Sequence, residues 1–276
     1  MTATLRARRK LFPVAASIAT LGTVLAVLPF PTSALAQDKP LRVGVTAGPH
    51  AEIMEAVKKV AAERGLPIQI VEFTDYVIPN QALADGDIEA NSFQHEPYLL
   101  NQMSKTKWKL TKVAYTIASP MGFYSGKYES FDALPTGARV AIQNDPTNGA
   151  RSLQLLHNEG ILKLRDPKSP VASVADIVEN PKKLKFVELD AAQLARSIPD
   201  VDAAAVNNNY AVQAGLDPAT DAILSEPVDN PWVNIIAVRE ADKDQPWVAK
   251  LIDAYRSEPV KQFVETRFKG TYIATW

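Results

Sequence analysis

The feature that most constrains the fold is an alternation of strand-like and helix-like segments that the chain contains twice. Leu41 to Ala47 has the apolar character of a buried strand, and apolar residues then recur at helical spacing as far as Gly65. A strand over 68–73, a short helix over 79–84 and a third strand over 88–93 complete the first series. Strands that alternate with helices form βαβ units, so this series predicts a mostly parallel sheet flanked by helices.

A second series of the same kind begins at Arg139. It consists of strands over 139–142, 185–189 and 201–206, with helices over 149–157 and 191–197 between them. One or two closing helices are expected over 247–268, with Pro259 as the break. The two series predict an α/β protein of two lobes.

Two further apolar stretches, 113–124 and 233–238, are each long enough to be a strand that passes from one lobe to the other. Two such crossings would form a hinge, with crossings near 115–125 and 225–235. We therefore expect lobe I to contain 37–122 plus 229–276, and lobe II to contain 123–228. Because open α/β sheets bind ligands beyond the carboxyl ends of their strands, loops of both lobes should surround one cleft.

Residues 1–36 have the order of a secretory signal peptide. Four basic residues between positions 6 and 10 precede an uncharged run from Leu11 to Ala36 that ends in Ala-Leu-Ala. Cleavage after Ala36 would leave Gln37 as the first residue; an uncleaved anchor is the alternative, because the run is long enough to span a bilayer. The Arg8-Arg9 pair leaves the choice between general and twin-arginine export open. We expect a periplasmic protein exported through a cleaved signal peptide.

Charge and composition narrow the function classes. Removal of residues 1–36 takes away four positive charges and no negative one, which moves the formal net charge from −1 to −5 and argues against nucleic acid. The absence of cysteine excludes disulfides and thiol catalysis, and it removes the acceptor for a lipid anchor at the cleavage site. The three histidines have no metal-ligand spacing. We expect a monomer with no lipid anchor, no metal and no cofactor.

Six sequence blocks resemble one known family. They are GPHAEIMEAV, DYVIPNQALADGDIEANSFQHEPYL, AIQNDPTNGARSLQLL, NPKKLKFVELDAAQLAR, VDAAAVNNNYAVQAGL and NPWVNIIAVRE. In this order they look like the MetQ/NlpA family of substrate-binding proteins, which deliver methionine to an ABC importer, and they cover nearly all of 41–276. The resemblance implies a type II periplasmic-binding-protein-like fold that closes around its ligand. One departure is Gln37, where many relatives carry a lipidated cysteine.

The resemblance also implies which residues contact the ligand. The matching positions are Tyr76, Phe93, His95, Arg151, Asn207 and Asn234. A methionine-like ligand presents a carboxylate, an ammonium and a thioether, and each of these calls for a different protein group.

Arg151 is the candidate for the carboxylate, because a guanidinium matches it in a two-point contact. It falls in the first turn of a predicted helix that Asn148 could cap, where the helix dipole disfavours a cation. A bound anion would offset that effect. The alternative is that Arg151 reaches solvent or pairs with a protein carboxylate such as Asp145.

Asparagines stand at both edges of the predicted cleft. Asn207 follows the strand over 201–206 and Asn234 opens the strand over 233–238, and amide oxygens can accept from an ammonium. Asparagine after a strand commonly forms a turn, which is our interpretation of Asn208. Asn209 is kept as a lower-ranked ligand contact, although it too is explained by a turn.

Aromatic and imidazole groups gather in the segment Thr74 to Tyr98. Tyr76 and Phe93 would pack on the thioether, with ordinary core packing as the alternative. His95 would point to the same side as Phe93 if the strand over 88–93 continued, where it could donate to the carboxylate or accept from the ammonium. His50, at a predicted helix start, is a lower-ranked candidate for the carboxylate.

We therefore predict a solute-binding protein, not an enzyme, that captures methionine or a close analogue and docks on an ABC permease and ATPase complex. The alternatives are a receptor for another small amino acid, a short peptide or a sulfur compound and, more distantly, a secreted hydrolase. The hydrolase has little support, since the sequence lacks HExxH, GxSxG and a phosphate loop.

Overall fold

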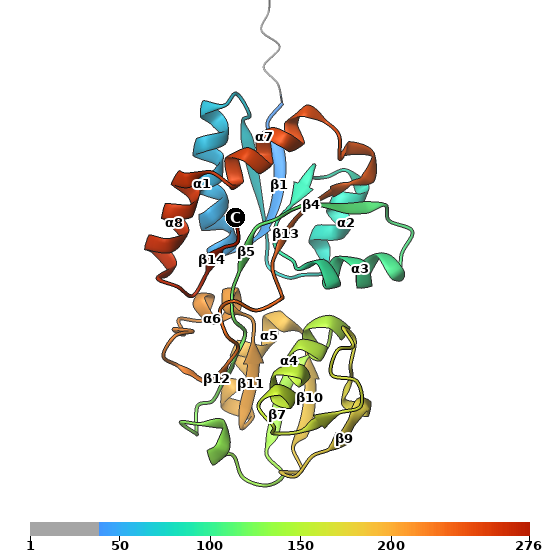
Figure 1. The fold of residues 1–276 in the computed structure, drawn as a ribbon, viewed down its shortest axis with the longest axis vertical. Coiled ribbons are helices and arrows are strands. Elements are labelled where there is room, and N and C mark those ends of the chain that lie inside the picture. The colour runs from blue at the N-terminus through green and yellow to red at the C-terminus, as the bar shows by residue number, and fades with distance from the viewer. Residues whose placement is uncertain (1–38) are drawn as a thin grey trace, which may run out of the picture. The chain divides into compact units, whose positions relative to one another are not determined.

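The computed structural model describes residues 39–276, so the predicted signal peptide lies outside the described residues. Two five-stranded sheets, one in each lobe, form the centre of the described part (Figure 1). No helix among the described residues is both long enough and apolar enough to cross a membrane.

The sheet of lobe I has the strand order β2-β1-β3-β13-β4. Its strands are β1 (Leu41–Thr46), β2 (Ile68–Phe73), β3 (Ala90–Asn91), β4 (Leu110–Tyr115) and β13 (Ile235–Arg239). Strand β1 pairs in parallel with β2 and β3, whereas β13 is antiparallel to both of its neighbours. The predicted parallel arrangement therefore holds for four strands, and β13 runs against them.

The sheet of lobe II has the equivalent order, β10-β7-β11-β6-β12. Its strands are β6 (Gly122–Tyr124), β7 (Arg139–Gln143), β10 (Lys185–Leu189), β11 (Ala203–Val206) and β12 (Ala222–Ser225). Strand β7 is parallel to β10 and β11, and β6 is antiparallel to β11 and β12. In each sheet the reversed strand is the one that follows a crossing from the other lobe.

The apolar stretch 113–124 is divided among three strands, instead of forming the single crossing strand that its length predicted. Strand β4 belongs to lobe I, β6 belongs to lobe II, and β5 (Ile117–Ala118) pairs with β14 (Ile273–Ala274) near the carboxyl terminus. Pro120 lies between β5 and β6 and has no N–H for a sheet ladder, so the pairing is interrupted there.

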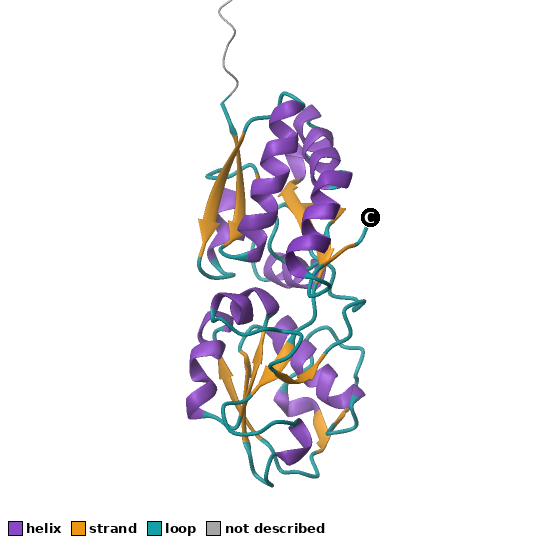
Figure 2. Cartoon of the chain, turned by 90° about the vertical axis from the view of Figure 1, so that its left-hand side faces the viewer, coloured by secondary structure: helices purple, strands orange, loops and turns teal. Residues whose placement is uncertain are grey.

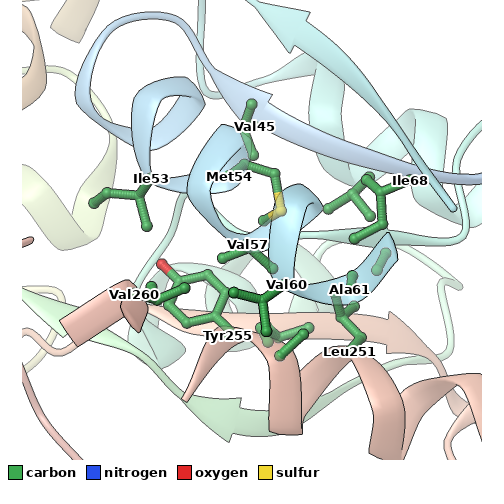
Figure 3. Packing of buried hydrophobic residues seen from close by; sticks show 14 of the residues in the cluster. Val45, Ile53, Met54, Val57, Val60, Ala61, Ile68, Leu251, Tyr255 and Val260 are labelled. Atoms are coloured by element: carbon green, nitrogen blue, oxygen red, sulfur yellow. The ribbon is translucent and has the colours of Figure 1, made fainter. Parts of the chain in front are cut away.

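Helices cover both faces of the lobe I sheet (Figure 2). On one face, α1 (Pro49–Glu63) packs with α7 (Pro246–Tyr255) and α8 (Glu258–Phe268) around a core that Figure 3 shows from close by. Val57, Leu251 and Val260 are among its fully buried side chains. The opposite face carries α2 (Ile78–Asp85) and α3 (Glu96–Ser104). The break between α7 and α8 falls just before the predicted Pro259, which is in the first turn of α8.

Lobe II repeats this two-sided arrangement with smaller elements. Helix α4 (Pro146–Asn158) and the pair β8 (Lys163–Leu164) and β9 (Ile177–Glu179) lie on one face. Helices α5 (Ala191–Ser197) and α6 (Asn208–Gln213) lie on the other. Strand β11 serves both faces, because Ala203 and Ala205 point to one core while Ala204 and Val206 point to the other. Short 3₁₀ turns occupy 131–133, 174–176, 198–200 and 240–242.

The prediction of a strand over 88–93 was wrong at its carboxyl end. Strand β3 stops at Asn91, and helix α3, which the sequence analysis did not predict, begins at Glu96 with His95 as its N-cap. His95 therefore does not continue the strand side by side with Phe93. Pro97 in the first turn of α3 is the sequence signal that marks this helix start.

Candidate ligand-binding site

A partly enclosed cavity lies between the lobes and is lined by side chains from both. It holds about 390 Å³ of space outside protein atoms, including some that is open to solvent. The lining residues are His50, Tyr76, Phe93, Gln94, His95, Tyr98, Ser119, Asn148, Arg151, Asn207, Asn208, Asn209 and Asn234.

The structure brings all eight sequence-predicted site residues to this one cavity, including the lower-ranked His50 and Asn209. The sequence analysis missed Gln94, Tyr98 and Ser119 as lining residues, and it assigned Asn148 and Asn208 only to capping and turns. The position of Asn208 directly after Asn207, a predicted ligand contact, was a sequence signal that Asn208 could also line the cavity. Nothing in the local sequence pointed to Ser119, which reaches the cavity because the first crossing passes along its edge.

Arg151 is held by a protein carboxylate, but not by the one that the sequence analysis considered. Its Nε lies 2.8 Å from Oε1 of Glu226, and its Nη2 donates to Oε2 of Glu226 and, over 2.9 Å, to the carbonyl oxygen of Ser119. Both charged side chains are buried, at 5% and 6% exposure. Among residues 39–276, no hydrogen bond is formed by Nη1 of Arg151, so one edge of the guanidinium is left for the cavity.

The helix that carries Arg151 starts earlier than predicted. Helix α4 begins at Pro146, and its N-cap is Asp145, whose carboxylate accepts from the backbone N–H groups of Thr147 and Asn148. The predicted cap, Asn148, instead donates its side-chain amide to Asp145, and its Oδ1 accepts from Nδ2 of Asn207 beside the cavity. Arg151 thus lies in the second turn of α4 and not the first. Burial raises the pKa of Asp145, although these hydrogen bonds oppose the shift.

The two cavity histidines are neutral at neutral pH. Burial lowers the pKa of His95 to about 3, with help from the charge of Arg151, and burial lowers the pKa of His50 to about 4. Nδ1 of His95 accepts from the backbone N–H of Tyr98, so its Nε2 carries the proton and faces Oδ1 of Asn148 at 3.4 Å. Nε2 of His50 donates to Oδ1 of Asn234 over 2.8 Å, which leaves its Nδ1 to accept from the hydroxyl of Thr46.

Aromatic rings form one wall of the cavity. The ring centroids of Tyr76 and Phe93 are 5.9 Å apart, and Tyr98 packs edge-on against both. Tyr210 of lobe II packs on Tyr76 at 5.0 Å. The hydroxyl of Tyr76 also donates to Oδ1 of Asn209 in lobe II. This wall therefore joins the lobes, and it presents apolar faces to the cavity.

The asparagines differ in how fully their polar atoms are used. Oδ1 of Asn207 accepts from Gln143, and its Nδ2 donates to Asn148. By contrast, Oδ1 of Asn208 and Nδ2 of Asn209 are buried and have no hydrogen-bond partner within the described residues. Buried polar atoms are nearly always paired, so these two atoms are candidates for direct contact with a ligand.

A buried amide network supports the loop that carries Phe93 and His95. Gln94 exchanges hydrogen bonds with Asn80 and donates to Oδ1 of Asn91. Asn91, two residues before Phe93, points into this network and does not line the cavity. No group of three or more metal-ligating side chains occurs in the part of the chain that the structure describes.

The two lobes and a cavity lined by a guanidinium, amides and aromatic rings define a class, the two-lobe solute-binding proteins. Comparison with known sequences assigns the family. The NlpA lipoprotein family model matches residues 41–276, so the chain belongs to that family. A relative named D-methionine-binding lipoprotein MetQ from Salmonella typhi is 46% identical over 239 residues, which cover 86% of this chain and 88% of the relative. The protein of that name from Escherichia coli K12 is 44% identical over the same shares.

Solved structures agree with the predicted fold. A nutrient-binding protein from Burkholderia cenocepacia, described as bound to methionine, is 50% identical with a TM-score of 0.83, and the match covers 86% of this chain and all of that one. A structure of the methionine-binding protein MetQ has a TM-score of 0.82 at 44% identity, with 86% and 98% covered. The predicted two-lobe binding-protein fold and the predicted MetQ/NlpA family are confirmed.

The predicted localisation without a lipid anchor is contradicted by these relatives. The family and its members are named lipoproteins, and one relative from Mannheimia haemolytica is named outer membrane lipoprotein 2. Our prediction depended on a single absence, that of cysteine from the sequence. The absence of one residue type was too little evidence to decide whether the protein has a lipid anchor.

Proposed function

We propose that this protein binds methionine or a close analogue in the cavity between its lobes and delivers it to an ABC importer. The observation that carries the proposal is that Arg151, with its unpaired Nη1, and Asn208, with its unpartnered Oδ1, line the same cavity as the rings of Tyr76 and Phe93. The names of the relatives support the identity of the ligand. A relative from Coxiella burnetii, described as a periplasmic substrate-binding protein of an ABC transporter, supports the importer.

Each part of the ligand has a complementary group. Nη1 of Arg151 would donate to the carboxylate, and the neutral His95 lies nearby as a second donor through Nε2. Oδ1 of Asn208 would accept from the ammonium, and it adds to the sequence-based assignment of Asn207 and Asn234, whose oxygens accept from Gln143 and His50 and each keep a second lone pair.

The thioether would lie against the aromatic wall. Tyr76, Phe93 and Tyr98 offer ring faces and edges, on which sulfur and methylene groups pack favourably. His50 and Asn234 hold each other and border the cavity from lobe I, and Asn209 adds an amide donor from lobe II. These contacts support a site that includes the predicted residues.

Closure of the lobes would be driven by the ligand. Three hydrogen bonds join the lobes: Tyr76 with Asn209, Asn208 with Thr271, and Gln213 with the carbonyl oxygen of Ala47 over 2.9 Å. A ligand that bridges Arg151 of lobe II and the rings of lobe I adds contacts available only in the closed form. We propose lobe boundaries near residues 122 and 229, with the two crossings as the hinge.

The protein would release its ligand chemically intact, so we propose binding without catalysis. The relatives' names describe binding proteins and thereby support this reading. We also propose that the protein acts as a monomer, that the closed form docks on the importer, and that nucleic acid is not a partner.

Calorimetry on protein that has been unfolded, stripped of ligand and refolded tests the proposal. We expect tight binding of L- or D-methionine with weaker binding of leucine and glutamate. Mass spectrometry after long incubation should recover the bound methionine intact. Absence of binding to both stereoisomers, or tighter binding of an unrelated amino acid, would contradict the proposed ligand.

A further inference from the structure

We propose that Glu226 determines the charge selectivity of the cavity. By neutralising Arg151 it makes the site select ligands that carry no net charge, so that an anion of similar shape without an ammonium is rejected. The inference rests on the proposed function, because it takes the natural ligand to be a zwitterionic amino acid.

The contacts of Glu226 leave little freedom to the pair. Its carboxylate takes hydrogen bonds from Nε and Nη2 of Arg151 and from the backbone N–H of Met121, which lies 2.8 Å from Oε2. The backbone N–H of Glu226 in turn donates to the carbonyl oxygen of Met121. The carboxylate is therefore surrounded by donors, and a glutamine amide at this position would direct its NH₂ group at one of them.

The pair also connects the site to both crossings between the lobes. Ser119 and Met121 belong to the first crossing, and Glu226 stands at the start of the second. The side chain of Asn230, further along the second crossing, donates to the same Ser119 oxygen that Arg151 uses. This geometry fixes which edge of the guanidinium faces the cavity.

The rest of the lining adds no formal charge. Among the cavity residues, Arg151 is the one with a charged side chain at neutral pH, since His50 and His95 stay neutral. Asp145, behind the lining, has both carboxylate oxygens occupied by hydrogen bonds from Thr147 and Asn148 at the start of α4. The cation that faces the ligand is thus compensated on its far side by Glu226.

The consequence is a balanced site, in which the negative charge of Glu226 offsets the positive charge of Arg151. A guanidinium without a counter-charge in a buried cavity would attract any carboxylate and repel an ammonium. With Glu226 in place, the attraction for a bare anion is reduced, whereas a zwitterion can use Arg151 and the neutral oxygen of Asn208 together. Selectivity between the two ligand types then depends on Glu226, which does not line the cavity.

Competitive calorimetry with two probes tests the proposal. L-Methionine is compared with 4-(methylsulfanyl)butanoate, which keeps the carboxylate and thioether and lacks the ammonium. In Glu226→Gln, the ratio of the two affinities should shift toward the acid by about tenfold or more, the order expected for one uncompensated charge near a buried ligand. The control is Glu179→Gln, which removes the same charge from an exposed pair with Lys163 and should leave the ratio unchanged.

A purely structural role for Glu226 would weaken both ligands by the same factor, and an unchanged ratio overturns the proposal. Should Glu226→Gln fail to fold, the unmodified chain decides. A balanced site should bind both the acid and methioninamide at least about tenfold more weakly than methionine, because each lacks one charge-assisted contact. Binding of the acid as tightly as methionine would contradict the proposed role of Glu226 in charge selectivity. Failure of methionine itself to bind would contradict only the proposed function.

Discussion

The two lobes share one strand order but bring different chemistry to the cavity. Lobe I contributes the rings of Tyr76, Phe93 and Tyr98, while lobe II contributes Arg151 and most of the amides. In both lobes the lining residues come from segments that follow strands or begin helices. The comparison teaches that topology decides where a loop lies, and that side-chain identity decides what it can hold.

The lobes also differ in how they hold charge. The buried ion pair of Arg151 and Glu226 lies on the lobe II side of the cavity, whereas lobe I lines the cavity with two histidines, His50 and His95, that burial keeps neutral. On the lobe II side of the cavity a buried charge is compensated by an opposite charge, whereas on the lobe I side desolvation keeps the titratable groups uncharged. The following experiments test that difference.

The largest effect is expected from Arg151→Ala. Methionine affinity should fall by about 1.5–3 kcal/mol, as for a lost hydrogen bond to a charged group. The unfolding free energy should fall by about 3–5 kcal/mol, because Glu226 is left buried without its partner. Calorimetry and denaturant unfolding measure the two changes. Arg165→Ala, which removes an exposed partner of Asp176, is the matched control and should alter neither measurably.

Acid should destabilise the fold through the lobe I histidines. Unfolded histidine titrates near 6.5, whereas the folded pKa values are about 4 for His50 and about 3 for His95. Stability is thus complete above pH 6.5 and is lost as the pH falls toward these values, since the unfolded state binds the protons first. His50 alone should account for up to about 3 kcal/mol. Denaturant unfolding of His50→Gln between pH 4 and 7 should show a shallower decline; an identical curve would contradict the assignment.

Substitution of one buried glycine in each lobe compares the two lobes directly. A Cβ on Gly149 in α4 would lie 2.8 Å from the backbone oxygen of Gln143, which cannot move easily. A Cβ on Gly44 in β1 would meet the tips of Ile88 and Phe73, which are flexible side chains. Overpacking typically costs about 1–3 kcal/mol. We expect Gly149→Ala to lower both stability and methionine affinity, because α4 carries Arg151, and Gly44→Ala to lower stability only. Equal methionine affinities in the two variants would contradict the expected difference between the lobes.

The smallest effect is expected from Tyr76→Phe. The change removes the hydrogen bond to Asn209 in the other lobe and should weaken methionine binding by about 0.5–1.5 kcal/mol. Tyr115→Phe removes a hydroxyl contact with Glu96 within lobe I and serves as the control. Calorimetry that finds the same affinity in Tyr76→Phe as in the parent would show that this bond between the lobes does not support the closed form.

Local sequence patterns were enough for most of the secondary structure. Strands β2 and β10 and helix α5 have the bounds that their apolar patterns predict. The failures occurred where two patterns met: the strand expected to reach Phe93 ended at Asn91, because the chain turns to form the His95 cap of α3. The Glu96-Pro97 pair after His95 carried that information.

The partner of Arg151 was beyond local reasoning. Glu226 is 75 residues away along the chain, and no periodicity links the two. The sequence analysis proposed Asp145, a near neighbour, whose oxygens are in fact used by the start of α4. Likewise, the free Oδ1 of Asn208 is recognised only when the partners of every neighbouring amide are known.

By itself, the sequence determined the α/β class and the duplicated lobes, because apolar spacing is a local property, and the resemblance of its six blocks gave the family and eight of the residues that line the cavity. Only the tertiary structure decided which partner each polar group has, because burial, desolvation and ion pairing depend on atoms that distant segments bring together. That is why Arg151 was identified early from the family resemblance together with its chemistry, while Glu226 required the fold.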